Sequence, residues 1–420
     1  MYLYRTLFQC ECQPGQQDSR YNHDIQNYCV TFISRDNLGV PSPVQRADAA
    51  CTPTAGGSPS TDDVPAIVEA ISSCGNGGTI VIPEGSTYYL NTALDLDGCS
   101  GCQFQIEGTL LFSDDTDYWN GETAMINVKD VEGLTMHSLT GSGVIDGNGQ
   151  ASWDLFAEDE SYERPTLLYI TGGSNIKVSN LLQKNPPNVF VSVKEGTTNA
   201  AFTDLTLNAE STSDNEPKNT DGFDIGESTY VTISNTTVVN DDDCIAFKPG
   251  CDYLTVTDIT CTGSHGLSVG SLGKSSDDTV SNVWVEGATM ISSTKAAGIK
   301  TYPSGGDHGL SSVKNVTWKD VVVKDCEYAI QIQSCYGEDE EYCTSNPGNA
   351  VLSGITFQGF SGTTNDKYGP VTGNLNCGAD GECDVSVVDY TVEAASGDGE
   401  VLCANTPSEL GVSCSSGASG

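Results

Sequence analysis

Three residues that can carry chemistry recur at a fixed interval along the chain. Asp243 follows Asp221 by 22 residues, and His265 follows Asp243 by another 22. If the chain winds into coils of about 22–24 residues, these positions stack on consecutive coils at the roughly 4.8 Å spacing of neighbouring strands. Asp242 joins them if the chain bends at 240–243, since strict strand alternation sends adjacent side chains to opposite faces. The spacing therefore predicts a cluster of carboxylates beside an imidazole.

Such a cluster supplies the two protonation states that hydrolysis of a glycosidic bond requires. A protonated carboxyl delivers a proton to the leaving oxygen, while an ionised one activates water or attacks the sugar. Like charges a few Å apart raise the pKa of one member, which keeps that member protonated at mildly acidic pH. Asp-rich loops also bind calcium or shape turns, and these are the alternative interpretations.

The residues around the cluster are suited to binding a sugar acid. His265 lies in the glycine-rich segment 264–273, where a sugar could approach the backbone closely. Lys218, Lys248 and Lys300 are candidate partners for a substrate carboxylate, and balancing the acidic charge is their simpler explanation.

A short unit with two apolar residues alternating with polar ones recurs and ends at Asn or Asp. Successive Asn/Asp anchors lie 24, 31, 23, 24 and 33 residues apart. A minimum of 23–24 with occasional excess is typical of a solenoid with some enlarged loops. We therefore predict an all-β fold, a single-domain right-handed parallel β-helix. The copies are 176–180, 200–204, 231–235, 254–258, 280–282 and 313–315.

One helix is predicted, over residues 60–73, and everything after it is expected to form strands. Residues 60–62 can cap this helix, and Pro65 fits its first turn. Its predicted apolar face consists of Val64, Ile67, Val68 and Ile71. It would cover the N-terminal end of the β-helix, where a sheet edge is otherwise exposed. The cysteine-containing segment 374–420 would close the other end.

The charge balance excludes whole classes of function. With 18 Lys+Arg against 57 Asp+Glu, the net charge of −39 repels nucleic acid and anionic membrane surfaces. No run approaches the roughly 18 apolar residues of a membrane span. With a sequence pI near 4.1, the protein carries less negative charge in acidic surroundings, so we expect an acidic pH optimum on a polyanionic substrate.

Cysteine usage indicates an oxidising compartment. Among 17 cysteines, several lie close together without a histidine at zinc-ligand spacing, which favours disulfides over a metal site. The glycosylation triplets at Asn235 and Asn315 agree with secretion. Candidate pairs are Cys99/Cys102, Cys335/Cys343, Cys377/Cys383 and Cys403/Cys414, which lie close in sequence, and Cys244/Cys261, whose separation nearly closes one coil; the sequence leaves most pairings open.

The N-terminal segment differs from the rest of the chain. Residues 1–46 lack the apolar stretch of a signal peptide, because Cys10, Glu11 and Pro14 stand where it belongs. We expect these residues to be a disordered or incorrectly assigned signal or pro region. The catalytic domain is predicted over residues 47–420, as a secreted, extracellular monomer.

At the same residues the sequence resembles the polygalacturonase family, family 28 of the glycoside hydrolases, over about residues 50–420. The resemblance implies that Asp242 is the general acid, that Asp221 and Asp243 activate water, and that His265 supports the acid. It further implies a right-handed β-helix, inversion by single displacement, and no metal or other cofactor. The matching motifs are Asn219-Thr220-Asp221, Asp242-Asp243-Cys244, Ser264-His265-Gly266 and Gly298-Ile299-Lys300.

One motif departs from the family pattern. Gly298 stands where the family's pectin-backbone hydrolases carry arginine, and Arg164 is the only arginine after Arg46. Losing that guanidinium should weaken a carboxylate contact and open space, leaving Lys300 to hold the carboxylate. Asn219 and Tyr302 are the other predicted substrate-binding residues.

The segment 295–306 is similar to that of fungal family members that cut within xylogalacturonan, as are residues 218–230 and 403–407. The resemblance implies hydrolysis of α-1,4-linked galacturonan carrying xylose, an acidic plant cell-wall pectin. Three alternatives remain open at this point: an exo-polygalacturonase, a calcium-dependent pectate-lyase-like enzyme, and a non-catalytic carbohydrate-binding β-helix.

Overall fold

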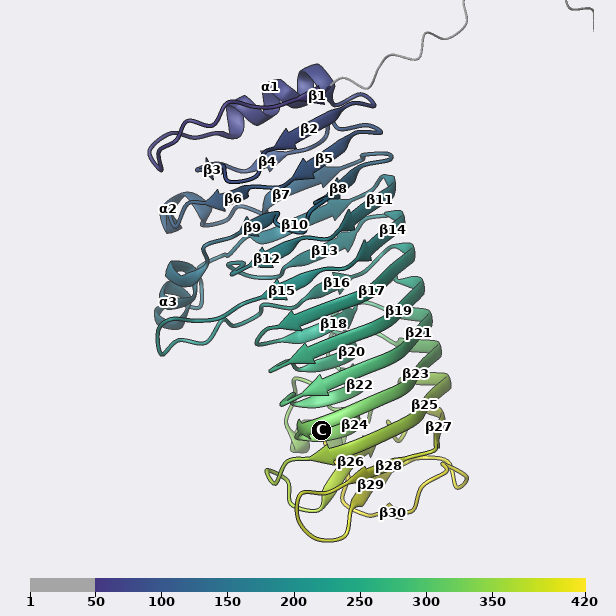
Figure 1. Ribbon diagram of the computed structural model, residues 1–420. Coiled ribbons are helices and arrows are strands. Elements are labelled where there is room, and N and C mark those ends of the chain that lie inside the picture. Colours follow the sequence, from purple (N-terminus) through teal and green to yellow (C-terminus); the bar gives the residue numbers. More distant parts are fainter. Residues whose placement is uncertain (1–49) are drawn as a thin grey trace, which may run out of the picture. The chain divides into compact units, whose positions relative to one another are not determined.

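The computed structural model describes residues 50–420, so the segment 1–46 lies outside the described part. The described residues form successive coils whose strands pair in parallel with those of the neighbouring coils (Figure 1). Two long sheets result, and the prediction of a parallel β-helix is confirmed.

The larger sheet has 18 strands, and in the later coils its strands are longer than those of the second sheet. Its later strands are long because one strand continues through a bend that separates two strands in the earlier coils, as β17 pairs with both β14 and β15. Its strands are β1 (Ala50–Cys51), β2 (Thr79–Ile82), β3 (Thr87–Leu90), β5 (Gln103–Ile106), β6 (Thr109–Phe112), β8 (Thr135–His137), β9 (Val144–Asp146), β11 (Ser174–Ser179), β12 (Leu182–Lys184), β14 (Thr198–Thr203), β15 (Thr206–Asn208), β17 (Thr229–Val239), β19 (Asp252–Thr262), β21 (Asp278–Ile291), β23 (Ser311–Cys326), β25 (Val351–Thr364), β27 (Glu382–Val388) and β28 (Thr391–Glu393).

The second sheet has 12 strands, one from each coil, and it carries the predicted site. Its central strands are buried on both faces, so apolar and small residues predominate in them, and Asp243, Lys295 and Lys300 are buried exceptions. In order they are β4 (Leu94–Asp95), β7 (Ala124–Lys129), β10 (Thr166–Thr171), β13 (Val191–Lys194), β16 (Phe223–Ile225), β18 (Asp243–Phe247), β20 (Gly266–Leu272), β22 (Lys295–Thr301), β24 (Tyr328–Gln333), β26 (Val371–Asn376), β29 (Glu400–Ala404) and β30 (Cys414–Ser415).

The core runs between the sheets along the stack of coils. In β17, Val231 and Ile233 are buried before the bend and Thr236 and Val238 after it, while Thr232 and Thr237 between them are exposed, which is the period-2 pattern of the repeat. Like side chains stack from coil to coil, as Trp318 and Phe357 do with ring centroids 4.8 Å apart. Each fully buried side chain of this size contributes about 1.5–3 kcal/mol, so the stacked core is the main source of stability.

The Asn and Asp anchors of the repeat lie at turns, but at two different ones. Asp204, Asn235 and Asp258 follow one another at one turn, with φ between 47° and 55°. The last two predicted copies are out of phase: Asn282 pairs with the position of Tyr253, one bend earlier in the coil. Asn and Asp tolerate the left-handed region better than other non-glycine residues. Both turns therefore favour them, and the sequence alone does not show which of the two turns a given Asn or Asp occupies.

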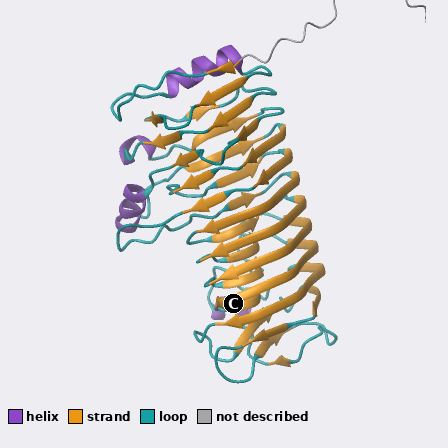
Figure 2. Cartoon of the chain, viewed as in Figure 1, coloured by secondary structure: helices purple, strands orange, loops and turns teal. Residues whose placement is uncertain are grey.

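Helix α1 (Val64–Cys74) covers the N-terminal end of the solenoid, as predicted, although it begins at Val64 rather than residue 60 (Figure 2). Val68 was wrongly placed on its buried face, because it is 43% exposed and Ala70 is buried instead. The expectation that only strands follow is wrong. Short loops fold into α2 (Thr116–Trp119), α3 (Gln150–Glu158) and α4 (Glu340–Ser345). Among the described residues, no helix is long and apolar enough to span a membrane.

Six disulfides fasten the described residues. All five candidate pairs form, and Cys51–Cys74 additionally ties the first strand to α1. Cys251 and Cys326 are buried free thiols.

Candidate active site

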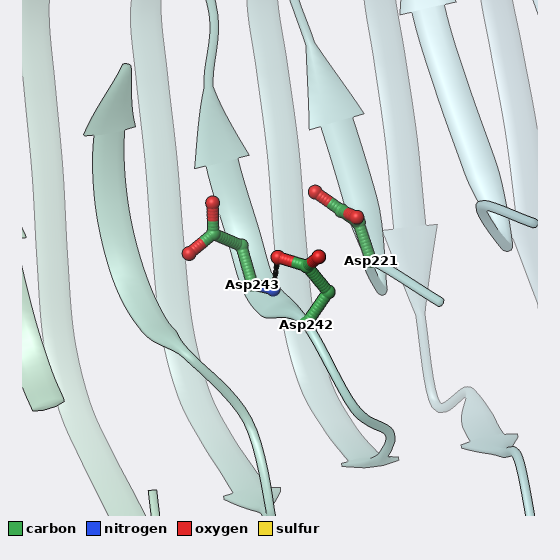
Figure 3. Close-up of side chains that lie close together, drawn as sticks. All are labelled: Asp221, Asp242 and Asp243. Carbon is green, nitrogen blue, oxygen red and sulfur yellow. Dashed lines mark hydrogen bonds between the residues drawn. The ribbon is translucent and has the colours of Figure 1, made fainter. Parts of the chain in front are cut away.

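Three carboxylates meet at the beginnings of β16 and β18. One oxygen from each of Asp221, Asp242 and Asp243 lies within 4.8 Å of the others, and Figure 3 shows the three side chains grouped together. Parallel pairing of β16 with β18 places Asp221 and Asp243 on adjacent coils, because Phe223 pairs with Ile245. The predicted cluster therefore forms.

A bend holds Asp242 on the same side as its neighbours. The side-chain amide of Asn240 donates to the carbonyls of Thr220, Asp242 and Asp243 at 2.8–3.1 Å. The backbone N–H of Asp243 then donates to Asp242 Oδ1 at 2.7 Å (Figure 3). A register shift at Asp243 follows, so that Gly266 rather than His265 pairs with Asp243.

His265 consequently lies beside Asp242. The equal 22-residue spacing had predicted that it would lie beside Asp243, one residue further along the chain. His265 Nδ1 lies 3.2 Å from Asp242 Oδ1, and both side chains are partly exposed. Burial raises the pKa of Asp242, but the hydrogen bond and charge of His265 outweigh it and hold the pKa at about 2. The hydrogen bond to Asp242 raises the pKa of His265. The pair thus retains a proton into mildly acidic and near-neutral pH, located on the ring.

Asp243 is the most buried of the three carboxylates, with 1% of its surface exposed. Ser268 Oγ donates to its Oδ1 and Lys300 Nζ to its Oδ2, both at 2.6 Å. Burial raises the pKa of Asp243, yet the nearby ammonium groups of Lys300 and Lys295 lower it overall. Asp243 is therefore held as an oriented carboxylate.

Asp221 has the opposite electrostatics. Burial, together with the charges of Asp224 and Asp242, raises its pKa well above the usual range. Its nearest cation, Lys248 Nζ, is 3.9 Å away and is 3.5 Å from Asp224. In the free enzyme Asp221 is therefore the carboxyl that most readily holds a proton, whereas the resemblance assigns the general acid to Asp242.

Coupling within the cluster reconciles the high pKa of Asp221 with the predicted role of Asp242 as general acid. Groups this close titrate as one unit, so the proton on Asp221 or His265 belongs to the cluster rather than to one residue. Asp242 is the carboxyl most accessible to a substrate and stands against a protonated ring. The arrangement can deliver a proton at Asp242 while Asp243 stays ionised, as acid–base hydrolysis requires.

Arg164 is a site residue that sequence reasoning missed. Its guanidinium donates to Asn219 Oδ1 at 2.7 Å, and Asn219 Nδ2 donates to Asp242 Oδ2 at 3.1 Å. The guanidinium is fixed by the carbonyls of Lys218 and Pro187 and lies 3.6 Å from the ring centroid of Phe156 on α3. The arginine therefore orients the Asn219 amide toward Asp242. No motif or spacing in the sequence indicates this role, because Arg164 lies more than 50 positions from Lys218 and Asn219 and only the fold of the loops brings them together.

The space expected beside Gly298 is filled. A Cβ at Gly298 would stand 2.4 Å from the carbonyl of Gln331 and about 3 Å from the stem of Lys295. Lys295 is buried, and its Nζ donates to the carbonyl of His265 at 2.7 Å. Burial and the charge of Lys300 lower the pKa of Lys295 to about 8. Glycine at 298 therefore makes room for a lysine rather than for substrate.

Lys300 and Tyr302 lie on one wall of the site. Lys300 is committed to Asp243, and Tyr336 lies near both residues, 5.5 Å from the ammonium of Lys300 and 5.6 Å from the Tyr302 ring. Contact of either residue with a substrate stays a prediction.

A cavity of about 500 Å³ adjoins the aspartates on the side of Arg164. Both positive and negative side chains line it. The cations are Arg164 and Lys248, the carboxylates are Asp221 and Asp224, and Asn219 lies among them. An acidic sugar placed here would meet cations as well as the carboxylates that act on it.

The three aspartates are also the one group of carboxylates in residues 50–420 that could hold a metal ion. Lys300 and Ser268 already engage both oxygens of Asp243, and Lys248 and His265 provide further positive charge. Charge compensation by side chains favours the prediction that catalysis needs no metal.

Carboxylates grouped at the ends of two neighbouring strands of a parallel β-helix fit an enzyme that hydrolyses glycosidic bonds by acid–base chemistry. The family model for glycosyl hydrolases family 28 matches residues 74–414, and the chain belongs to that family. It is 76% identical over 372 residues to a probable endo-xylogalacturonan hydrolase A of Emericella nidulans, covering 88% of this chain and 93% of that protein.

Solved structures agree with this assignment. The crystal structure of endo-xylogalacturonan hydrolase from Aspergillus tubingensis has a TM-score of 0.88 at 70% identity, covering 89% of this chain and all of that one. Polygalacturonase from Erwinia carotovora, at 21% identity and a TM-score of 0.68, shares the fold over 86% of this chain and 96% of its own.

Proposed function

We propose that this glycoside hydrolase is a secreted, monomeric endo-enzyme that cleaves α-1,4-galacturonosyl linkages in xylose-substituted galacturonan. The observation that carries the proposal is the Asp221–Asp242–Asp243 cluster with His265 stacked on Asp242. High identity to relatives named for that activity supports the substrate. Six disulfides support an oxidising, extracellular location.

In the proposed reaction the glycosidic oxygen lies against Asp242. The carboxyl of Asp242, supplied with a proton by its partner His265, protonates that oxygen as the bond to the anomeric carbon breaks. Water held between Asp221 and Asp243 attacks the anomeric carbon, and its proton passes to a carboxylate of this pair. Asn219, fixed by Arg164, keeps Asp242 directed at the leaving oxygen.

The stereochemistry can be checked separately. Single displacement on an α-linkage gives a β reducing end at first, although oxygens within 4.8 Å are closer than the roughly 6.5–9.5 Å carboxyl separation usual for inverting enzymes. Proton NMR of the first products should show the β-anomer. An α-anomer in the first minutes would instead indicate a covalent intermediate on an aspartate.

The function is tested by digesting xylogalacturonan and sizing the products with time. Mixed oligomers early in the digest, activity unchanged by chelator and no absorbance from unsaturated sugars are expected. Early release of monogalacturonate alone would make the enzyme exo-acting. Loss of activity with chelator would contradict metal-independent hydrolysis, and absorbance from unsaturated products would indicate elimination.

A further inference from the structure

A groove of about 970 Å³ lies on the outer face of the larger sheet, away from the strands that carry the aspartates. It crosses seven consecutive strands, β8, β11, β14, β17, β19, β21 and β23. At about 4.8 Å per strand the groove extends for roughly 29 Å along the solenoid. That length suits a linear polymer.

Hydroxyl, amide and aromatic groups line the groove. Thr232, Thr255, Trp284 and Thr317 follow one another in register along its floor. Tyr230, Tyr253 and Trp284 are exposed by 55%, 50% and 40%. Apolar ring faces beside hydrogen-bonding groups match a pyranose, which has C–H faces and a hydroxyl edge.

The two tyrosines occupy a costly backbone position. Asn175, Asn199, Tyr230, Tyr253, Asn282 and Asn315 stand at equivalent places on six coils, all with φ between 54° and 58°. Asparagine adopts this left-handed conformation readily, whereas a bulky side chain rarely does. Stacking of the two rings, 5.1 Å between centroids, recovers part of that cost. It does not explain why two rings remain in solvent where asparagine suits the backbone better.

The charge of the groove differs from that of the chain. The protein has 57 acidic residues, yet none lines the groove, which contains Lys177. Two carboxylates lie beside the groove: Glu286 is paired with Lys319 at 2.5 Å, and Asp252 accepts a hydrogen bond from the amide of Asn282 at 2.7 Å. Lys319 lies 5.8 Å from the Trp284 ring. A polyanion is repelled from most of this molecule but can approach here.

We propose that the groove is a second carbohydrate-binding site that holds a galacturonan chain of the polymer while another part of the same polymer is cut. The occupant's class rests on the proposed function. The site would retain the enzyme on its polymeric substrate without contacting the scissile bond.

Variants that copy neighbouring coils test the site without damaging the fold. Tyr230→Asn with Tyr253→Asn restores the residue found at the four other positions, and Trp284→Thr copies Thr255 and Thr317. The tyrosine variants should keep or raise the Tm, because asparagine tolerates the positive φ. Tyr368→Asn removes another exposed, stacked tyrosine outside the groove and serves as the control.

Retention on immobilised xylogalacturonan and on immobilised polygalacturonate is measured in the Asp242→Asn background. The groove variants should bind both polymers roughly two- to tenfold more weakly per lost aromatic contact, while Tyr368→Asn binds as the parent does. With an active Asp242, the groove variants should hydrolyse a short xylosylated oligomer at the parental kcat/KM.

Unchanged retention of the groove variants on both polymers would overturn the proposal. A second contrary outcome concerns the glycosylation triplet at Asn315, a lining residue. If groove-dependent retention appears only after N-linked glycans are removed, a glycan occupies the groove. Retention on polygalacturonate alone would keep the second site while contradicting the proposed xylosylated substrate.

Discussion

At the scale of single residues, the site depends on a series of side-chain contacts that holds Asp242 in place. His265 contacts one of its oxygens and Asn219 the other, and Arg164 fixes Asn219. The motifs predicted that His265 supports Asp242, and the two side chains are neighbours. Asn219 was predicted to bind substrate, and its contact with Asp242 was not foreseen. Arg164 and Lys295 were missed because their roles arise from contacts across loops and coils, which no local spacing encodes.

Arg164 provides the first residue-scale test. Arg164→Gln should lower kcat up to about a hundredfold, because Asp242 loses its orientation toward the leaving oxygen. KM for short substrates should change less. Arg164→Lys should restore part of kcat through one remaining bond to Asn219, a rescue that a purely structural role would not give. Equal loss in both variants, accompanied by a lower Tm, would contradict the positioning role.

The His265–Asp242 pair predicts the pH dependence. Because the pKa of His265 is raised, its ring stays protonated above the ordinary value of about 6.5, and activity should decline only as pH rises through the folded pKa. Asp242, with a pKa of about 2, contributes stability above about 3.9 that is lost as pH falls toward 2. The kcat profile should therefore peak at mildly acidic pH. A maximum above neutral pH would contradict proton delivery from this pair.

At the scale of secondary structure, the sequence predicted the repeating coil but not its phase. Buried alternation and Asn or Asp at turns made the β-helix recognisable. Two turn types with the same residue preference could not be separated without the pairing, so 280–282 and 313–315 were misaligned. Helices α2, α3 and α4 were missed because each is under three turns and lies in a loop.

The packing of β22 against β24 gives the element-scale test. Gly298→Ala should destabilise the protein by about 1–3 kcal/mol, because its Cβ would meet the Gln331 carbonyl and the stem of Lys295. Thermal unfolding checks this, with Gly399→Ala as the control, since a Cβ there meets only ordinary contacts. If Gly298→Ala unfolds at the parental temperature, the space beside residue 298 is open, as the sequence predicted. Lys295 would then not fill that space.

At the scale of the whole molecule, charge governs the encounter with substrate. A protein of net charge −39 and a galacturonan repel each other over the Debye length, about 30 Å at 0.01 M salt and 8 Å at 0.15 M. KM for the polymer at pH 6 should therefore fall as salt rises across this range. KM for a short oligomer should change less. A rise in KM with salt would show that local cations near Arg164 and Lys248 dominate the encounter.

The proposed function is tested most sharply by reducing-sugar release from xylogalacturonan and from unsubstituted polygalacturonate, side by side, by the parent and by Asp242→Asn. We predict faster release from the xylosylated polymer, reduced at least about a hundredfold in the variant. Equal or faster cleavage of bare polygalacturonate would contradict the substrate assignment, and an active variant would contradict the role of Asp242.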